Sequence, residues 1–254
     1  MRILVCVKRV PAPGARINLT DDARAIDARH LSFTVSPHEE CAVEEAIRIK
    51  EKHGGSVTVM TLGPGEAEEQ LRYAVSVGAD DGVLLTTDGS DWDPQATAAA
   101  LAARIDELEA SNGAFDLILF GNESADSGGY QVGIRVAHAL GRPVISGIKG
   151  LTVEDGSVAA RRETGSGFEV YNLPLPAVVA VKEGINLPRY PTLPGRLKAK
   201  KAAVAINEAT AAAGGLTMSR LFTPAEQKTS TKILGQGPEA ASAVVDLFEE
   251  LGLL

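Results

Sequence analysis

Cysteine is almost missing from this chain of 254 residues, which contains only Cys6 and Cys41. Two thiols cannot build a disulfide framework, and their spacing matches no metal-binding pattern. No apolar run approaches the roughly 18 residues needed to cross a membrane. The opening segment M-R-I-L-V-C-V-K shows neither an apolar signal sequence nor an Arg/Ser-rich presequence. We therefore expect a soluble protein of a reducing compartment, most simply the bacterial cytoplasm, that does not insert into a membrane.

Positive charge is also scarce. Lys and Arg number 25 against 33 Asp and Glu, a net charge of -8. This argues against nucleic-acid binding, because a basic surface is what neutralises phosphates. The histidines show neither metal-ligand spacing nor a paired nucleophile motif; they are His30, His38, His53 and His138. We therefore predict no catalytic residues and no metal site. The hydrophobic content of 44% is nevertheless normal for a folded domain.

Short apolar runs alternate with helical patterns up to residue 140. The runs predict strands at Ile3–Val7, Ser56–Leu62, Gly82–Thr86 and Phe115–Phe120. Apolar residues at helical spacing predict helices at Glu39–Lys52, from Gly65 to about Val77, at Pro94–Ser111 and at Gly128–Leu140. Alternation of this kind is typical of right-handed βαβ units. We predict an α/β fold with a mostly parallel, doubly wound sheet and helices on both faces.

The pattern changes beyond Gly150. Short strands joined by Gly/Asp/Ser turns predict antiparallel pairing that extends the same sheet, at Leu151–Glu154, Val158–Glu163, Phe168–Leu173 and Ala177–Lys182. After Lys201 the chain becomes Ala/Gly-rich, then polar, and ends with an amphipathic helix near Glu239–Leu251. We predict an α/β domain over residues 1–202 and a C-terminal arm over residues 203–254. The terminal helix either reaches another protein surface or docks on its own domain.

Three strand ends are candidate ligand-binding segments, because ligands of open parallel sheets bind outside the carboxyl ends of the strands. They are Val35–Glu39, where Ser36 could cap the following helix, Leu62–Gly65, and Gly121–Gly133. Asn122, Ser127 and Gln131 could bond a ribose or a base edge. Neither a Walker loop nor a G-x-G-x-x-G motif is present. Ordinary structural turns of this composition remain an alternative.

The segment Ile185–Lys201 reads I-N-L-P-R-Y-P-T-L-P-G-R-L-K-A-K-K. Its three prolines exclude a central strand or a helix interior, because proline fixes φ and lacks a donor. We predict a stiff loop over residues 185–197 that presents Tyr190 and Leu193 to a partner. A plain proline-rich linker is the alternative. The cationic run Arg196–Lys201 either supports the loop and meets a partner or is a solvated strand end.

Several motifs together resemble one known family. They are V-C-V-K-R-V-P at Val5–Pro11, S-P-H-E-E-C-A-V-E-E-A at Ser36–Ala46, Gly63-Pro64 with R-Y-A-V-S-V-G-A-D at Arg72–Asp80, and L-P-A-V-V at Leu175–Val179 followed by Ile185–Lys201. The last block is similar to a family pattern P-A-V-V…N-E-P-R-Y-x-T-L-P-x-x-x-K-A-K-K. Over nearly all of residues 1–202 the chain resembles the beta subunit of electron transfer flavoprotein, a Rossmann-like fold of the adenine nucleotide alpha-hydrolase-like kind.

The resemblance implies an obligate heterodimer with an alpha subunit that holds a redox FAD, shared at its edge with this chain near His38. It implies one bound AMP, with contacts at Cys6, Ser36, Pro37, His38, Glu39, Leu62, Gly121, Asn122, Glu123, Ser124, Ala125, Asp126, Ser127, Gly128, Gly129, Tyr130, Gln131 and Val132. The loop would bind acyl-CoA or related flavin dehydrogenases through Leu193, with Tyr190 and Arg189 shaping it. Electrons of fatty acid beta-oxidation would then pass to a quinone-linked oxidoreductase. The arm would embrace the alpha subunit.

Other functions stay open. Electron-bifurcating relatives carry a second FAD in place of AMP and typically show an Asp-Thr pair where Gly128 and Gly129 stand here. A homodimeric domain that senses adenine nucleotides would need neither flavin nor a second chain. An adenylate-activating hydrolase would need an S-G-G-x-D-S-type loop after the first strand, and Val10–Ala15 lacks one.

Overall fold

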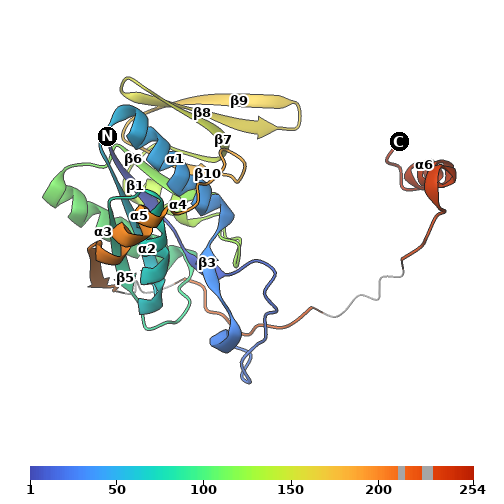
Figure 1. Ribbon diagram of the computed structural model, residues 1–254, viewed down its shortest axis with the longest axis horizontal. Helices are drawn as coiled ribbons and strands as arrows, with labels where there is room; N and C mark the ends of the chain where they lie inside the picture. Colours follow the sequence, from blue (N-terminus) through green and yellow to red (C-terminus); the bar gives the residue numbers. More distant parts are fainter. Residues whose placement is uncertain (211–214, 225–230) are drawn as a thin grey trace. The chain divides into compact units, whose positions relative to one another are not determined.

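The computed structural model describes residues 1–210, 215–224 and 231–254, which divide into two units, Met1–Ser219 and Arg220–Leu254. Within the described residues, the first unit contains a nine-stranded sheet in the order β11-β5-β4-β1-β6-β10-β7-β8-β9 (Figure 1). Neighbours from β11 to β7 run parallel, and β8 and β9 are added antiparallel. The mostly parallel, doubly wound sheet predicted from the sequence is confirmed.

Among the parallel strands, the central ones are apolar and buried because helices cover both of their faces, whereas β11 at the sheet edge is largely exposed. Their bounds are β1 Arg2–Cys6, β4 Ser56–Gly63, β5 Asp81–Thr86, β6 Leu117–Gly121, β10 Ala177–Val181 and β11 Val204–Glu208. The extension consists of β7 Val144–Glu154, β8 Ser157–Thr164 and β9 Gly167–Pro174, and a separate antiparallel pair joins β2 Arg9–Pro11 to β3 Phe33–Val35. The sequence pattern did not reveal the small pair or β11, which lies at the sheet edge beside β5.

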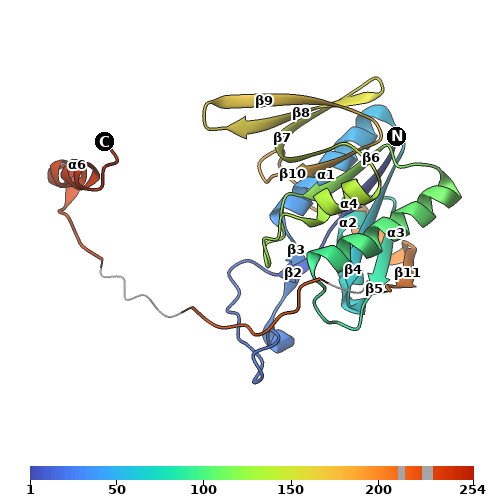
Figure 2. The same ribbon diagram turned by 180° about the vertical axis from the view of Figure 1, so that it is seen from behind.

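Two layers of helices enclose the sheet. α1 (Pro37–His53), α2 (Glu68–Val77) and α5 (Leu193–Lys201) pack on one face, and α3 (Pro94–Asn112) and α4 (Val132–Ala139) on the other (Figure 2). Alternate β1 side chains enter different layers: Ile3 and Val5 join the first core, Leu4 and Cys6 the second. Ile3, Leu4 and Val5 are completely buried, and each such side chain stabilises the fold by about 1.5–3 kcal/mol.

The predicted antiparallel series was wrong for Ala177–Lys182. β10 lies between β6 and β7 and runs parallel to both, with all five of its residues buried. A short, wholly apolar run fits a central parallel strand, and strand spacing alone does not reveal its partners. β7 also begins at Val144 rather than Leu151, because its first half pairs with β10 and its second half with β8. The antiparallel extension is therefore β7-β8-β9.

α4 begins at Val132, four residues later than the predicted helix at Gly128. Gly128 and Tyr130 have φ values of 54° and 56°, in the left-handed region, which an α-helix cannot contain. The chain from Asn122 to Gln131 is therefore an extended loop after β6 rather than the start of a helix.

The second unit ends in a helix, as predicted. α6 spans Ala240–Glu250 after a short turn of 3-10 helix at Gly237–Glu239. Val245 and Phe248 expose 47% and 42% of their surface. In the part of the chain that the structure describes, no helix has the length and apolarity to span a bilayer.

The predicted loop over residues 185–197 ends earlier than expected, because α5 begins at Leu193. Thr192 Oγ1 accepts a hydrogen bond from Gly195 N at 3.1 Å and caps the helix. Pro194 lies in the first turn, where a missing N–H leaves no intrahelical bond unmade. Proline excludes a helix interior but not the first turn of a helix, so Pro194 is compatible with the start of α5. α5 packs on α2, where Arg72 Nη1 donates to Ala199 O at 2.6 Å.

Gly195→Ala tests how closely α5 approaches α2. A Cβ at Gly195 would lie 2.1 Å from the backbone oxygen of Ser76, so we expect a loss of about 1–3 kcal/mol in the free energy of unfolding. Thermal or urea unfolding measures it. The matched control is Gly165→Ala, which has nothing within 4 Å and should unfold like the wild type. An unchanged Gly195→Ala variant would show that the two helices can separate freely.

Candidate functional site

The sheet has its topological switch point between β1 and β6. From β1 the chain builds β4 and β5 on one side and then returns to place β6 on the other. Cys6 at the end of β1 pairs with Phe120 near the end of β6. Ligands of open α/β sheets bind in the crevice at such a point, and the structure brings most of the predicted nucleotide residues to this edge.

Gly121 lets the start of α1 lie directly against the end of β6. A Cβ at Gly121 would lie 2.6 Å from Glu39 Cγ, 3.0 Å from Glu39 N and 3.1 Å from His38 Cβ. Ser36 occupies the N-cap position of α1. Its hydroxyl was expected to cap the helix, but it donates to Glu123 O at 3.4 Å instead. The hydroxyl instead ties the segment before α1 to the loop after β6.

Glu39 is a buried carboxyl group in the floor of the crevice, 6% exposed. Its Oε2 accepts the Lys8 backbone N–H at 2.8 Å. Burial raises the pKa of Glu39 to about 8, against the opposing effects of this hydrogen bond and the Lys8 charge. Burial and the Glu39 charge also raise the pKa of the Cys6 thiol. Cys6 is thus a buried, unreactive thiol at the end of β1.

Lys8 links the crevice floor to the loop after β6. Its Nζ lies 2.6 Å from Asp126 Oδ2 and 3.5 Å from Ser127 Oγ. Burial works against ionisation of Asp126, but the Lys8 ammonium and hydrogen bonds from Lys8 and Ser124 lower the pKa of Asp126 overall. Ser124 and Ser127 share a hydrogen bond of 2.9 Å. Lys8 was missed as a site residue, although its place just after the first strand could have indicated it.

His38 bridges two loops at the same edge. Its Nδ1 accepts the backbone N–H of Glu183 at 3.1 Å, and its Nε2 lies 3.3 Å from Glu123 Oε1. In neutral His38 the proton therefore resides on Nε2, facing a carboxylate. A hydrogen bond to Glu123 also raises the pKa of Tyr130, which is exposed. Glu183 joins the site from far along the chain, so no local sequence signal pointed to it.

The remaining predicted nucleotide residues lie around this cluster. Leu62 is the second-to-last residue of β4 and packs with the same core layer as Cys6, and Val132 starts α4 against that layer. Gly129 faces the start of α3, since a Cβ at Gly129 would lie 3.7 Å from Pro94 Cγ. The structure groups the predicted residues along one edge, with Leu62 and Gly129 at its margins. The loop between β6 and α4 also contains Asn122, Ala125 and Gln131.

The donor set of the crevice suits a mononucleotide. The Lys8 ammonium and the hydroxyls of Ser124 and Ser127 are donors for phosphate or ribose oxygens, and the Glu123 and Asp126 carboxylates can accept ribose hydroxyls. Gly128, with positive φ, opens the loop backbone for close approach of a ligand. No cluster of metal-ligating side chains occurs among the described residues.

The predicted partner-binding residues lie in a different place. Tyr190 and Leu193 are 91% and 73% exposed, as expected for residues that a loop presents. Arg189 points instead to α1, where its guanidinium pairs with Glu44 at 2.8 Å and with Glu51 at 2.6 Å. Arg189 therefore anchors the loop to the domain.

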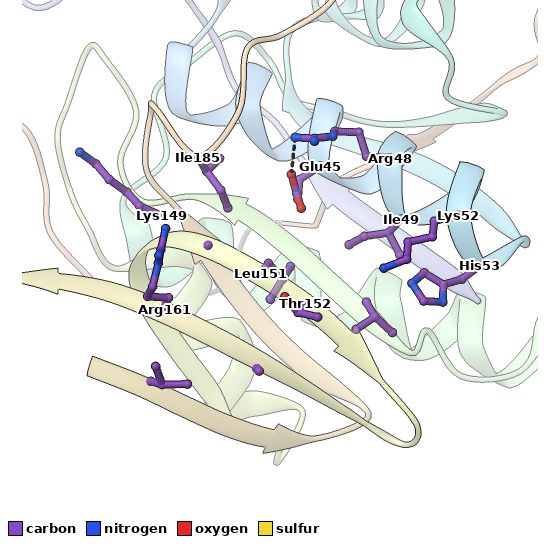
Figure 3. A pocket seen from close by; sticks show the side chains of 14 residues that line it. Glu45, Arg48, Ile49, Lys52, His53, Lys149, Leu151, Thr152, Arg161 and Ile185 are labelled. Atoms are coloured by element: carbon purple, nitrogen blue, oxygen red, sulfur yellow. Dashed lines mark ion pairs between the residues drawn. The ribbon is translucent and has the colours of Figure 1, made fainter. Parts of the chain in front are cut away.

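A groove of about 660 Å³ lies between α1 and the β7-β9 extension (Figure 3). Arg48 and Lys52 line it from α1, and Lys149 and Arg161 from the extension. The Arg48–Glu45 pair drawn there spans 3.7 Å. None of the predicted nucleotide residues lines this groove, so size alone does not make it the nucleotide site. The converging polar groups lie instead at the switch point of the sheet.

Comparison with known proteins gives a consistent result. The domain family described as "Electron transfer flavoprotein domain" matches residues 25–212. Proteins named electron transfer flavoprotein subunit beta are similar over most of the chain. The one from Mycobacterium leprae is 38% identical over 210 residues, covering 80% of this chain and 77% of that protein. The Bacillus subtilis protein is 35% identical, and the match covers 85% of this chain and 86% of that protein. The Megasphaera elsdenii protein is 32% identical, and the match covers 98% of this chain and 97% of that protein.

Glu39→Gln should change how stability depends on pH. The pKa of Glu39 rises from 4.5 to about 8 on folding, so the folded state holds a proton that the unfolded state releases. Stability therefore falls by about 1.4 kcal/mol per pH unit between these two values and then levels off. Gln keeps the acceptor for Lys8 N–H without the proton.

We expect Glu39→Gln to match the wild type near pH 4.5 and to melt at a higher temperature above pH 8. Thermal unfolding across this range measures the difference. Exposed Glu154→Gln is the control and should follow the wild-type curve. Parallel curves for Glu39→Gln and the wild type would mean that Glu39 is ionised throughout.

Proposed function

This chain belongs to the family of electron transfer flavoprotein beta subunits, and on that premise we propose that it is the docking and nucleotide-binding half of a two-chain electron carrier. An alpha subunit holds the FAD, AMP occupies the switch-point crevice of this chain, and dehydrogenases dock on the loop before α5. The observation that carries the proposal is the exposed apolar loop: Tyr190 and Leu193 face solvent on a segment that Arg189 fixes to α1.

The crevice at β1 and β6 supports the AMP assignment. Lys8, Ser124 and Ser127 are the donors for the nucleotide, and the loop Asn122–Gln131 surrounds it. Gly121, by admitting α1 so closely, fixes Glu39 and His38 at the crevice edge. We place His38 toward the FAD of the alpha subunit. The flavin, when bound, supplies the electron-accepting chemistry, while the residues of this chain bind, orient and exclude water.

A fixed loop suits an electron carrier, because such a protein must recognise partners and release them quickly. Redox encounters are small, below about 1,200 Å² of buried surface. Each side chain that is already ordered avoids roughly 0.5–1.5 kcal/mol of entropy loss on binding. We propose Leu193 as the apolar anchor, acyl-CoA or related flavin dehydrogenases as electron donors in fatty acid beta-oxidation, and a quinone-linked oxidoreductase as acceptor, all in the bacterial cytoplasm.

The C-terminal arm is proposed to bind the alpha subunit. Val245 and Phe248 of α6 are exposed apolar side chains on an amphipathic helix. Burying them against a second chain would remove apolar surface from water. This assigns separate roles to the two ends of the chain: α6 for the permanent subunit and the loop for transient partners.

Coexpression with the neighbouring alpha-subunit gene should yield a yellow heterodimer. We expect one FAD and one AMP per complex, identified by chromatography of the nucleotides after denaturation. Two FAD and no AMP would assign the crevice to a second flavin. A stable, colourless homodimer would contradict the proposed function.

Leu193→Ala should weaken docking without disturbing the complex. We expect the same FAD and AMP content and the same melting temperature, because Leu193 is exposed. The rate of flavin reduction by the dehydrogenase at low concentration should fall about tenfold, as for loss of an interface anchor. Leu216→Ala, at another leucine that is 80% exposed, is the control. A wild-type rate for Leu193→Ala would remove the docking role.

A further inference from the structure

Leu187 is an exposed leucine in an unusual setting. It is 90% exposed, as much as Tyr190, yet its neighbours on both sides are fixed to α1. Side chains with such exposure usually belong to loops that move freely. Here the backbone on either side is fixed, so the leucine cannot turn inward.

Asn186 makes the first attachment. Its Nδ2 donates to Cys41 O at 3.0 Å and to Glu45 Oε2 at 2.9 Å. Cys41 Sγ in turn donates to Asn186 O at 3.8 Å. Both the side chain and the backbone of Asn186 thus bind the same turn of α1.

Arg189 makes the second attachment, on the other side of Leu187 and Pro188. Its Nε and backbone N donate to Glu44 Oε2 at 2.8 and 3.2 Å, and its Nη2 donates to Glu44 Oε1 at 3.1 Å. Nη1 and Nη2 reach Glu51 at 2.6 and 3.0 Å. The Glu44 side chain is only 8% exposed and the Arg189 side chain 35%, so the pair is partly shielded from solvent, and its charge-assisted hydrogen bonds are stronger than neutral ones.

The attachments determine which surface a partner meets. The Arg189 charge is matched by two carboxylates beneath the loop, while Leu187, Tyr190 and Leu193 face outward. The far end of the loop is fixed as well, since Thr192 caps α5 and α5 packs on α2. The presented surface is therefore apolar and preformed. It suits a partner with an apolar depression better than one with an acidic patch.

We propose that Leu187 is a second apolar anchor for the redox partner and that buried Glu44 is the positioning residue that holds it. This rests on the proposed docking function of the loop.

The first test uses the coexpressed heterodimer and an acyl-CoA dehydrogenase from the same organism, reduced by its acyl-CoA substrate. Leu187→Ala and Leu187→Glu should raise the KM for the dehydrogenase about fivefold or more, as expected for an interface anchor, and leave kcat and the FAD content unchanged. Leu216→Ala serves as the control. If Leu187→Ala behaves like the wild type while Leu193→Ala is impaired, the second anchor is wrong but the docking function stands. If both variants behave like the wild type, the docking function itself fails.

The second test addresses the positioning role. Glu44→Gln keeps the size of the side chain but loses the charge, so we expect a raised KM, an unchanged kcat and faster amide hydrogen exchange over residues 186–192. Glu51→Gln removes the charge of the other carboxylate that pairs with Arg189. Because the Glu51 side chain is 54% exposed and that of Glu44 only 8%, Glu51→Gln should raise KM less. Because Glu44 acts through Leu187, we expect the two changes together to be less than multiplicative. The Leu187→Ala/Glu44→Gln double variant should raise KM by a factor well below the product of the factors by which the two single variants raise it. Fully multiplicative effects, or a Glu44→Gln variant with wild-type KM and exchange, would overturn the positioning role.

Discussion

The packing of α1 against the end of β6 is the constraint on which both candidate sites depend. Gly121 leaves no room for a side chain between β6 and the first turn of α1, so this helix has one position relative to the sheet. Its first turn brings His38 and Glu39 to the nucleotide crevice. Its next turns carry Glu44 and the other carboxylates that hold the loop. One helix therefore fixes the distance between the switch-point residues and the exposed loop.

The two sites use charge in opposite ways. At the crevice, burial raises the pKa of Glu39 to about 8, and Lys8 pairs with Asp126, while the Glu123 carboxylate faces His38. At the loop, ionised groups are paired, and hydrogen bonds to Glu51 and Glu44 raise the pKa of Arg189 still further. The pair with Glu44 is costly to break, because removing Arg189 would leave the largely buried Glu44 carboxylate unsatisfied. This makes the loop rigid at working pH without help from a ligand.

The sequence predicted the core more fully than the sites. Apolar runs such as Ile3–Val7 specify buried parallel strands, and the strand-end rule predicted which polar residues gather at the switch point of the sheet. Predictions failed where the decisive interaction was nonlocal or depended on one dihedral angle. Because the backbone of Tyr130 is left-handed, α4 begins later than predicted. The partners of β10 depend on the strand order of the whole sheet. Stiffness of the loop was attributed to its prolines, whereas Glu44 lies 145 residues from Arg189 and contributes most of the contacts. The local spacing of residues along the sequence does not reveal a pair that is this far apart.

The central claim is that this chain presents a preformed loop to transient partners while the flavin resides on a second chain. Amide hydrogen exchange of the intact heterodimer, recorded alone and with saturating dehydrogenase, tests this claim most directly. The account predicts that the dehydrogenase slows exchange over residues 186–193, while exchange over the segment 121–131 depends on AMP and not on the dehydrogenase. Exchange over residues 186–193 that stays unchanged at saturating dehydrogenase would contradict the account, because the dehydrogenase would then not cover the loop.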